Sequence, residues 1–160
     1  MSALVEIEFR LNGISRRAAV PPQMSALEML RDMMGQHGTK YGCGEGECGA
    51  CTISVDRRTV NSCLMFAVAC NGRDIQTIEG LAATPFGESL NRALVEHGAV
   101  QCGFCTPGIM MQAQQVLTDN PDASRAQIQR GLEGNLCRCT GYRKILDAIE
   151  AAAHPSPAGG

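Results

Sequence analysis

Cysteine is the residue type with the clearest capacity for chemistry in this 160-residue sequence, which contains nine cysteines and only three histidines. A first cysteine set has the spacing C-x4-C-x2-C-x11-C and consists of Cys43, Cys48, Cys51 and Cys63. The first three members match the ligand spacing of a plant-type [2Fe–2S] cluster. The intervening Gly44, Gly46 and Gly49 let the backbone approach the sulfurs and adopt unusual dihedral angles, and side-chain bulk there is expected to push the backbone away. The segment 39–51 is therefore predicted to be a cluster-binding loop.

A second cysteine set has the spacing C-x2-C-x31-C-x-C and consists of Cys102, Cys105, Cys137 and Cys139. Each pair precedes a predicted helix start, with Thr106 as N-cap before Pro107 in one case and Thr140 as N-cap in the other. Helix N-termini favour anionic centres, and four thiolates around metal make such a centre. Spacing alone leaves two alternatives open, a second iron–sulfur cluster or a zinc ion held by four thiolates.

Other candidate residues are predicted to be structural. Cys70 fits neither set and ends an apolar run, so it is expected to be a buried free thiol. The three histidines are scattered and are expected to lie on the surface. Glu45 and Glu47 are expected to face solvent rather than to act as a catalytic carboxylate pair.

The N-terminal half, about 1–78, is predicted to be a small sheet crossed by one helix. Alternation of apolar and polar residues indicates strands, and a serine followed three residues later by glutamate indicates a helix start. The predicted elements are a strand from Val5 to Leu11, an Asn12-Gly13 hairpin, a second strand ending at Val20, a short helix beginning at the Ser25–Glu28 capping box, and strands at Thr52–Val55 and Ile75–Ile78.

The C-terminal half, about 80–154, is predicted to be entirely helical, followed by a flexible tail at 155–160. Apolar residues recur there at helical spacing, and proline and glycine mark the breaks. The predicted helices are Phe86–Glu96, one from Thr106 to the break at Asn120-Pro121, one begun by a Ser124–Gln127 capping box, and a last one ended by His154-Pro155.

Composition excludes several classes of function. The formal net charge is −2 and no long basic run exists, so no nucleic-acid-binding surface is expected. The longest apolar run, Cys63 to Cys70, is far too short for a membrane span. The N-terminus lacks the pattern of a signal peptide, so the cytoplasm is the expected location. Disulfides are disfavoured there, and nine cysteines therefore indicate metal binding.

Two longer motifs resemble those of one enzyme family. They are Gln101-Cys102-Gly103-Phe104-Cys105-Thr106-Pro107-Gly108 and Gly134-Asn135-Leu136-Cys137-Arg138-Cys139-Thr140-Gly141-Tyr142, and the segment Thr39 to Thr52 adds a third. The chain resembles, over about residues 4–153, the small iron–sulfur subunit of the molybdenum hydroxylases, the family of xanthine dehydrogenase, aldehyde oxidoreductase and carbon monoxide dehydrogenase.

The resemblance implies an α+β fold, with a plant-ferredoxin-like β-grasp lobe followed by a four-helix lobe. It implies that the first cysteine set holds an outer [2Fe–2S] cluster and the second set an inner one beside a molybdopterin. Gln101 matches the residue that hydrogen-bonds the pterin, and Cys139 the ligand nearest to it. The implied partners are a large molybdopterin subunit and a medium FAD subunit, with the heterotrimer forming a dimer.

Two other classes of function are kept as alternatives. A free-standing ferredoxin would carry electrons without a permanent partner, but it would have no pterin for Gln101 to contact. A structural zinc module would bind zinc and contain neither iron nor acid-labile sulfide. The substrate of the enzyme is not indicated by this sequence.

Overall fold

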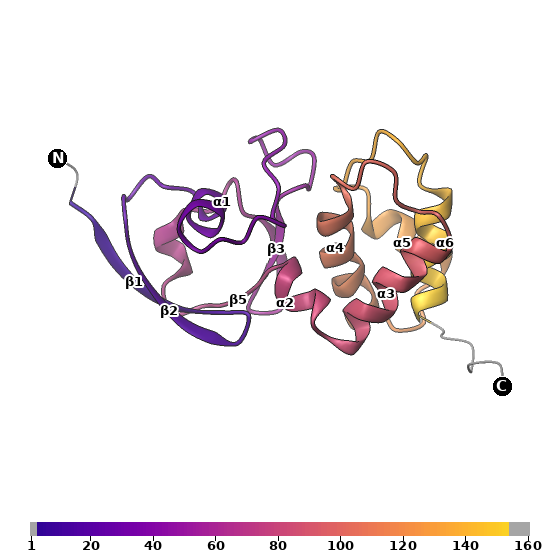
Figure 1. The fold of residues 1–160 in the computed structure, drawn as a ribbon, viewed down its shortest axis with the longest axis horizontal. Coiled ribbons are helices and arrows are strands. Elements are labelled where there is room, and N and C mark those ends of the chain that lie inside the picture. The colour runs from indigo at the N-terminus through magenta and orange to yellow at the C-terminus, as the bar shows by residue number, and fades with distance from the viewer. Residues whose placement is uncertain (1–2, 154–160) are drawn as a thin grey trace.

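The computed structural model describes residues 3–153, which form two lobes lying end to end (Figure 1). One lobe is a sheet with a short helix packed on it, and the other is built of helices. This arrangement confirms the predicted α+β fold class. The predicted flexible tail, 155–160, and His154 lie outside the described residues.

Five strands form one mixed sheet in the order β2-β1-β5-β3-β4. β1 and β5 pair in parallel, and the other neighbouring strands pair antiparallel. The predicted β1–β2 hairpin is confirmed, with φ angles of 52° at Asn12 and 82° at Gly13 that suit a tight Asn-Gly turn. The strands are Val5–Leu11 (β1), Ile14–Val20 (β2), Thr52–Val55 (β3), Arg58–Asn61 (β4) and Asp74–Gln76 (β5).

The helix on the sheet begins at the predicted capping box. Ser25 Oγ accepts a hydrogen bond from Glu28 N at 3.1 Å, and Glu28 Oε2 accepts one from Ser25 N at 2.8 Å. The helix α1, Ala26–Glu28, continues as a π-helical turn, η1, Met29–Met33. Its buried side chains pack on the inward residues of β1 to form the core of the sheet lobe. This core fixes the two ends of the loop that carries the first cysteine set.

Three features of the sheet lobe differ from the prediction. The strand β4 and the 3-10 helix η2, Ala67–Cys70, were not predicted. The strand predicted for Ile75–Ile78 is wrong at its end, because β5 stops at Gln76 and Ile78 begins the helix α2. Thr77 is the fully buried N-cap residue between them. An isoleucine suits a strand or a buried helix equally, so the local pattern does not separate the two.

The second lobe contains five helices in the described part of the chain. Their apolar faces meet in one continuous core. The predicted capping box of Ser124 and Gln127 is confirmed at the start of α5, where the Arg125 guanidinium pairs with Asp147 at 2.8 Å and with Glu150, both on α6. The helices are Ile78–Ala82 (α2), Pro85–Glu96 (α3), Thr106–Asp119 (α4), Arg125–Gly131 (α5) and Arg143–Ala153 (α6).

The helix α4 joins the lobes by lying against β3 and β4 (Figure 1). Gln115 Oε1 accepts a hydrogen bond from Thr59 N at 3.2 Å, and Arg58 pairs with Asp119 at 3.2 Å. Exposed ion pairs of this kind contribute less than about 1 kcal/mol. The ion pair therefore adds little to the contact of α4 with β3 and β4, and the lobes also meet beside the cysteine loops.

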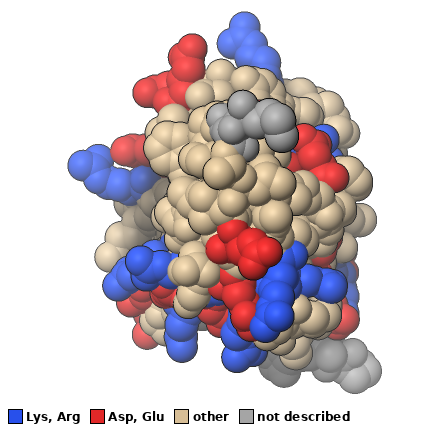
Figure 2. Space-filling model, turned by 90° about the vertical axis from the view of Figure 1, so that its left-hand side faces the viewer, with Lys and Arg blue, Asp and Glu red and all other residues tan. Residues whose placement is uncertain are grey.

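Charged side chains of both signs are interspersed on the end of the sheet lobe that faces the viewer in Figure 2. Among residues 3–153, no helix combines the length and the apolar character that crossing a membrane requires.

Candidate metal centres

The loop of the first cysteine set runs from η1 to β3 and turns its amides towards sulfur. Cys43 Sγ accepts a hydrogen bond from Glu45 N at 3.4 Å, and Cys48 Sγ accepts one from Cys43 N at 3.4 Å. The amides of Glu45, Cys48 and Glu47 lower the pKa of the Cys43 thiol to about 6. Such donors stabilise a thiolate, which is the form that binds iron.

Cys51 and Cys63 meet at the base of the same loop. Cys51 is buried immediately before β3, and its carbonyl oxygen accepts hydrogen bonds from Ser62 Oγ at 2.7 Å and from Ser62 N at 3.3 Å. Burial, together with the adjacent Cys51 thiol, raises the pKa of Cys63 to about 11. A thiol in this position ionises readily only when a bound metal takes the place of its proton.

The structure confirms one of the two roles predicted for the glycines of the loop and corrects the other. A Cβ atom at Gly44 would meet the Tyr41 side chain, and one at Gly46 would meet Leu64, rather than a sulfur. The glycine that faces a sulfur is Gly42, where a Cβ would lie 2.7 Å from Cys48 Sγ. The predicted need for unusual dihedral angles is confirmed at Gly44, Gly46 and Gly49, whose φ angles are +74°, +79° and +67°, whereas a Cβ at these positions would meet groups other than sulfur.

Gly49 is required by the junction between the lobes. Its φ of +67° is left-handed, and a Cβ there would overlap the Gly134 carbonyl oxygen and lie 2.5 Å from Asn135 Nδ2. Gly108, in the first turn of α4, comes equally close, because a Cβ there would overlap the Gly49 carbonyl oxygen. Both cysteine loops thus meet at a point where no side chain fits.

The second cysteine set is assembled from the turn before α4 and the loop before α6. Cys139 Sγ lies 3.5 Å from Cys102 Sγ, although 37 residues separate them. The Phe104 amide and then the Cys139 thiol lower the pKa of Cys102, and burial raises that of Cys105 to about 12. Cys105 itself occupies the N-cap position of α4, so the N-cap prediction for Thr106 was off by one residue.

Cys137 is supported by its own loop. Burial disfavours its thiolate, but hydrogen bonds from the Thr140 hydroxyl and from nearby amides outweigh burial and lower the pKa. Thr140 Oγ1 lies 3.1 Å from Cys137 Sγ. The prediction that Thr140 caps α6 was wrong, because that helix begins at Arg143 and the hydroxyl is used on the sulfur. Tyr142, held at a φ of 67°, accepts a hydrogen bond from Cys137 N at 2.7 Å.

The remaining candidate residues lie outside the two cysteine sets. Gln101 is exposed and donates from Nε2 to the Cys139 carbonyl oxygen at 3.2 Å. Cys70 is fully buried, as predicted, and burial raises its pKa to about 11. Glu45, Glu47 and the two described histidines are exposed, also as predicted.

The donor atoms of each set fit a [2Fe–2S] cluster, whose four thiolates are divided between two irons. Within residues 3–153, no three His, Cys, Asp or Glu side chains converge closely enough to hold one metal ion. Each set nevertheless brings four free thiols to one loop region, with amide or hydroxyl donors aimed at sulfur. Soft thiolates with inward-facing donors are the ligand environment of iron–sulfur clusters.

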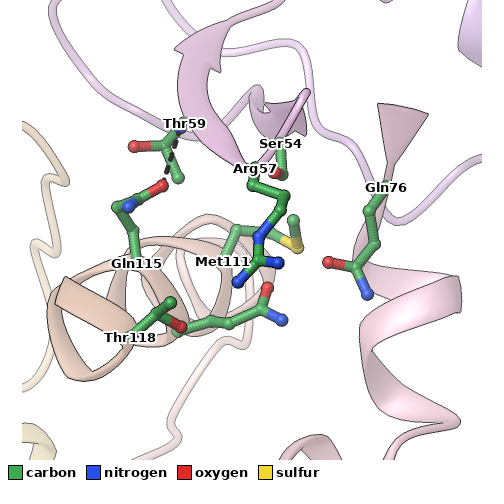
Figure 3. Close-up of a pocket in the computed structure, with 8 residues that line it drawn as sticks. Ser54, Arg57, Thr59, Gln76, Met111, Gln115 and Thr118 are labelled. Carbon is green, nitrogen blue, oxygen red and sulfur yellow. Dashed lines mark hydrogen bonds between the residues drawn. The ribbon is translucent and has the colours of Figure 1, made fainter. Parts of the chain in front are cut away.

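A crevice between the lobes lies apart from these centres. It has a volume of about 170 Å³ and lies between β3, the β3–β4 turn and α4 (Figure 3). Its lining is mixed and includes Ser54, Arg57, Gln115 and Met111, but no cysteine. The residues that line it do not pair a nucleophile with a base.

Comparison with known proteins identifies the class of protein to which this chain belongs. Residues 9–78 match the family model of the 2Fe-2S iron-sulfur cluster binding domain, and residues 77–150 match that of the [2Fe-2S] binding domain. The chain therefore consists of two [2Fe-2S] domains in tandem.

Full-length relatives define the family. The chain is 41% identical to the nicotinate dehydrogenase small FeS subunit of Eubacterium barkeri, over 92% of this chain and 94% of that protein. It is 40% identical to the xanthine dehydrogenase iron-sulfur-binding subunit of Escherichia coli O157:H7, over 92% and 94% of the two chains. It superposes on quinoline 2-oxidoreductase of Pseudomonas putida 86 with a TM-score of 0.89 and 43% identity, covering 94% of this chain and 97% of that chain. The chain belongs to the small iron–sulfur subunits of the molybdenum hydroxylase family.

Proposed function

We propose that this chain relays electrons within its enzyme, with one [2Fe–2S] cluster in each cysteine set. Bound there, each cluster supplies a carrier of one electron at a time. Electrons released at a molybdenum centre on a large partner subunit enter at the second cysteine set and leave from the first. They then reach FAD on a medium partner subunit or an external acceptor.

One hydrogen bond between the sets carries this proposal. Leu136 N donates to the Cys48 carbonyl oxygen at 2.9 Å, and Leu136 directly precedes Cys137. A residue of the first set is thus linked to a residue of the second by one hydrogen bond and one peptide unit. So short a bridge supports two centres that work in series.

The exposed end of the second set supports its position towards the pterin. Cys102 and Cys139 are the two exposed cysteines of the chain, and Gln101 lies beside them. The Gln101 amide carries both donor and acceptor atoms, which suits the edge of a pterin. In this proposal Gln101 bonds the molybdopterin of the large subunit, and Cys139 is the ligand nearest to it.

Apolar side chains around both loops support partner subunits on two sides. Tyr41 is 63% exposed and Leu64 61% exposed beside the first set, and Leu136 is 57% exposed beside the second. Exposed apolar residues gathered at functional loops are typical of interaction surfaces. The proposed assembly is a heterotrimer with the molybdopterin and FAD subunits, paired into a dimer, in the reducing cytoplasm where free thiols persist.

Anaerobic purification with whatever subunits accompany the chain tests this function. The expected product is red-brown, contains iron and acid-labile sulfide in equal amounts, and carries molybdenum in the large partner. A folded, iron-containing chain that elutes alone would instead establish a free carrier. A colourless chain with zinc and no sulfide would establish a structural zinc module, and either result contradicts the proposal.

A further inference from the structure

The junction between the two cysteine loops centres on a buried amide side chain that belongs to neither ligand set. Asn135 is only 4% exposed, in a loop whose neighbours Gly134 and Leu136 are exposed. Burying an amide is unfavourable unless its hydrogen bonds are satisfied. The hydrogen-bond partners of Asn135 therefore indicate its role.

Its side chain reaches across to the first cysteine loop. Asn135 Nδ2 donates to the Gly49 carbonyl oxygen at 3.0 Å and to Thr52 Oγ1 at 3.2 Å. A carbonyl oxygen can only accept, so the nitrogen of the amide must face Gly49. Thr52 Oγ1 also donates to the Gly49 oxygen, at 2.7 Å. The turn that runs from Cys48 to β3 is therefore clamped by one side chain from the other lobe.

Its backbone holds the second cysteine loop. The Asn135 carbonyl oxygen accepts a hydrogen bond from Tyr142 Oη at 3.0 Å, and the same Tyr142 oxygen accepts from Cys137 N at 2.7 Å. Tyr142 closes the loop that carries Cys137 and Cys139 onto Asn135. One residue thus holds both loops, by its side chain on one side and by its carbonyl group on the other.

The backbone packs tightly around the Asn135 side chain. Gly49 and Gly108 approach so closely that a Cβ on either would overlap backbone, and a Cβ at Gly108 would also lie 3.2 Å from Asn135 Nδ2. Close packing of this kind transmits a shift in one group to its neighbours. Removal of the Asn135 side-chain amide is therefore expected to let the turn between Cys48 and β3 move relative to Cys137.

We infer that Asn135 is a positioning residue that sets the separation between the two cysteine loops, and hence the coupling between the two centres. This inference rests on the proposed relay function. Asn135 does not need to contact either cluster for this effect. Its effect acts through the hydrogen bond between Leu136 N and the Cys48 oxygen, which lies directly beside the clamp.

Two variants remove the clamp in different ways. Asn135→Ala deletes the amide, and Asn135→Asp places a carboxylate oxygen against the Gly49 carbonyl oxygen. Gln115→Ala is the matched control, because Gln115 also joins the lobes through an amide bonded to backbone, at Thr59 N, but lies on α4 away from the loops. All three are made in the full chain, purified with the subunits that accompany it.

The first readout is the enhancement of one reduced cluster's spin relaxation by the other, which falls steeply with their separation. Both Asn135 variants are expected to retain their iron and to lose a large part of this enhancement, whereas Gln115→Ala keeps it. Wild-type enhancement in fully loaded Asn135 variants would refute the inference. Absence of iron from the wild-type chain would instead refute the proposed relay.

The second readout does not depend on iron. Hydrogen exchange of the Leu136 amide, followed by mass spectrometry, is expected to accelerate about 30-fold in the Asn135 variants, the scale set by the loss of two neutral hydrogen bonds. Unchanged exchange would contradict the clamp. If an Asn135 variant fails to fold, Thr52→Val replaces it, because this variant removes one acceptor of the Asn135 amide. A smaller acceleration of exchange at the Leu136 amide in Thr52→Val supports the inference, and an unchanged exchange rate refutes it.

Discussion

Gly49→Ala probes the closest approach between the two lobes. The φ of Gly49 is +67°, and an added Cβ would overlap the Gly134 carbonyl oxygen and lie 2.5 Å from Asn135 Nδ2. The left-handed conformation alone costs an alanine about 1–2 kcal/mol. Forcing a methyl group into closely packed backbone adds about 1–3 kcal/mol. The expected loss is therefore about 2–5 kcal/mol of the free energy of unfolding.

Gly72→Ala separates the two contributions. Gly72 has a φ of +72°, nearly that of Gly49, but a Cβ there meets nothing within 4 Å. Only the conformational cost applies, so Gly72→Ala is expected to lose about 1–2 kcal/mol. The difference between the variants isolates the contact with Gly134 and Asn135.

Denaturant unfolding of the two variants, followed by circular dichroism at matched iron content, measures this difference. Gly49→Ala is expected to unfold at a clearly lower denaturant concentration than Gly72→Ala, with a similar slope. A chain of this size shifts its melting temperature by about 2–4 °C per kcal/mol, so heating should separate them by several degrees. Equal destabilisation of the two variants would show that the junction has room for a methyl group, contrary to the geometry.

Removal of single side chains tests the ligand sets, the pterin contact and the capping box. Cys48→Ala is expected to abolish the electron paramagnetic resonance signal of one cluster and to leave the other; loss of both or of neither contradicts the division into two sets. Gln101→Ala is expected to keep both clusters but to slow their reduction by the enzyme's substrate, and an unchanged rate argues against a pterin contact. Ser25→Ala is expected to cost about 1 kcal/mol at pH 7. Hydrogen bonds from the Ser25 amide, which Ser25→Ala keeps, and from the Ser25 hydroxyl, which it removes, lower the pKa of Glu28. The share of the cost that comes from the hydroxyl bond to the carboxylate is therefore present above the ordinary glutamate pKa and is lost as pH falls through the lowered value, whereas the share from the bond that Glu28 N donates to Ser25 Oγ remains. A cost of Ser25→Ala that is the same in acid as at pH 7 would contradict that origin.

The elements that were predicted correctly are those encoded by neighbouring residues. The Asn12-Gly13 hairpin and the two capping boxes each depend on residues within four positions of one another, so the sequence pattern contains the whole interaction. The strand β4 was missed because its residues, Arg58–Asn61, are polar except for Val60 and are only partly buried. Pairing with β3 and cover from α4, both distant in the sequence, make it a strand.

The cysteine loops show the same limit. Spacing grouped the cysteines into two sets, since the chemistry of iron–sulfur ligation is local in the sequence. It did not predict that the Thr140 hydroxyl would reach the Cys137 sulfur, because a threonine before a helix is indistinguishable from an N-cap.

The meeting of Gly49, Gly108 and Asn135 was also not predicted. These residues come from three separate segments of the chain, and only the packing of the two lobes brings them together. A glycine and an asparagine next to ligand cysteines were visible in the motifs, but the motifs do not say what those residues touch.

Electron paramagnetic resonance of the reduced chain, combined with iron and sulfide analysis, tests the central claim most directly. Two distinct [2Fe–2S] signals of equal spin count, with iron and sulfide sufficient for two clusters, are the predicted result. A single signal, or zinc in place of iron in either cysteine set, would contradict the claim that both sets hold clusters.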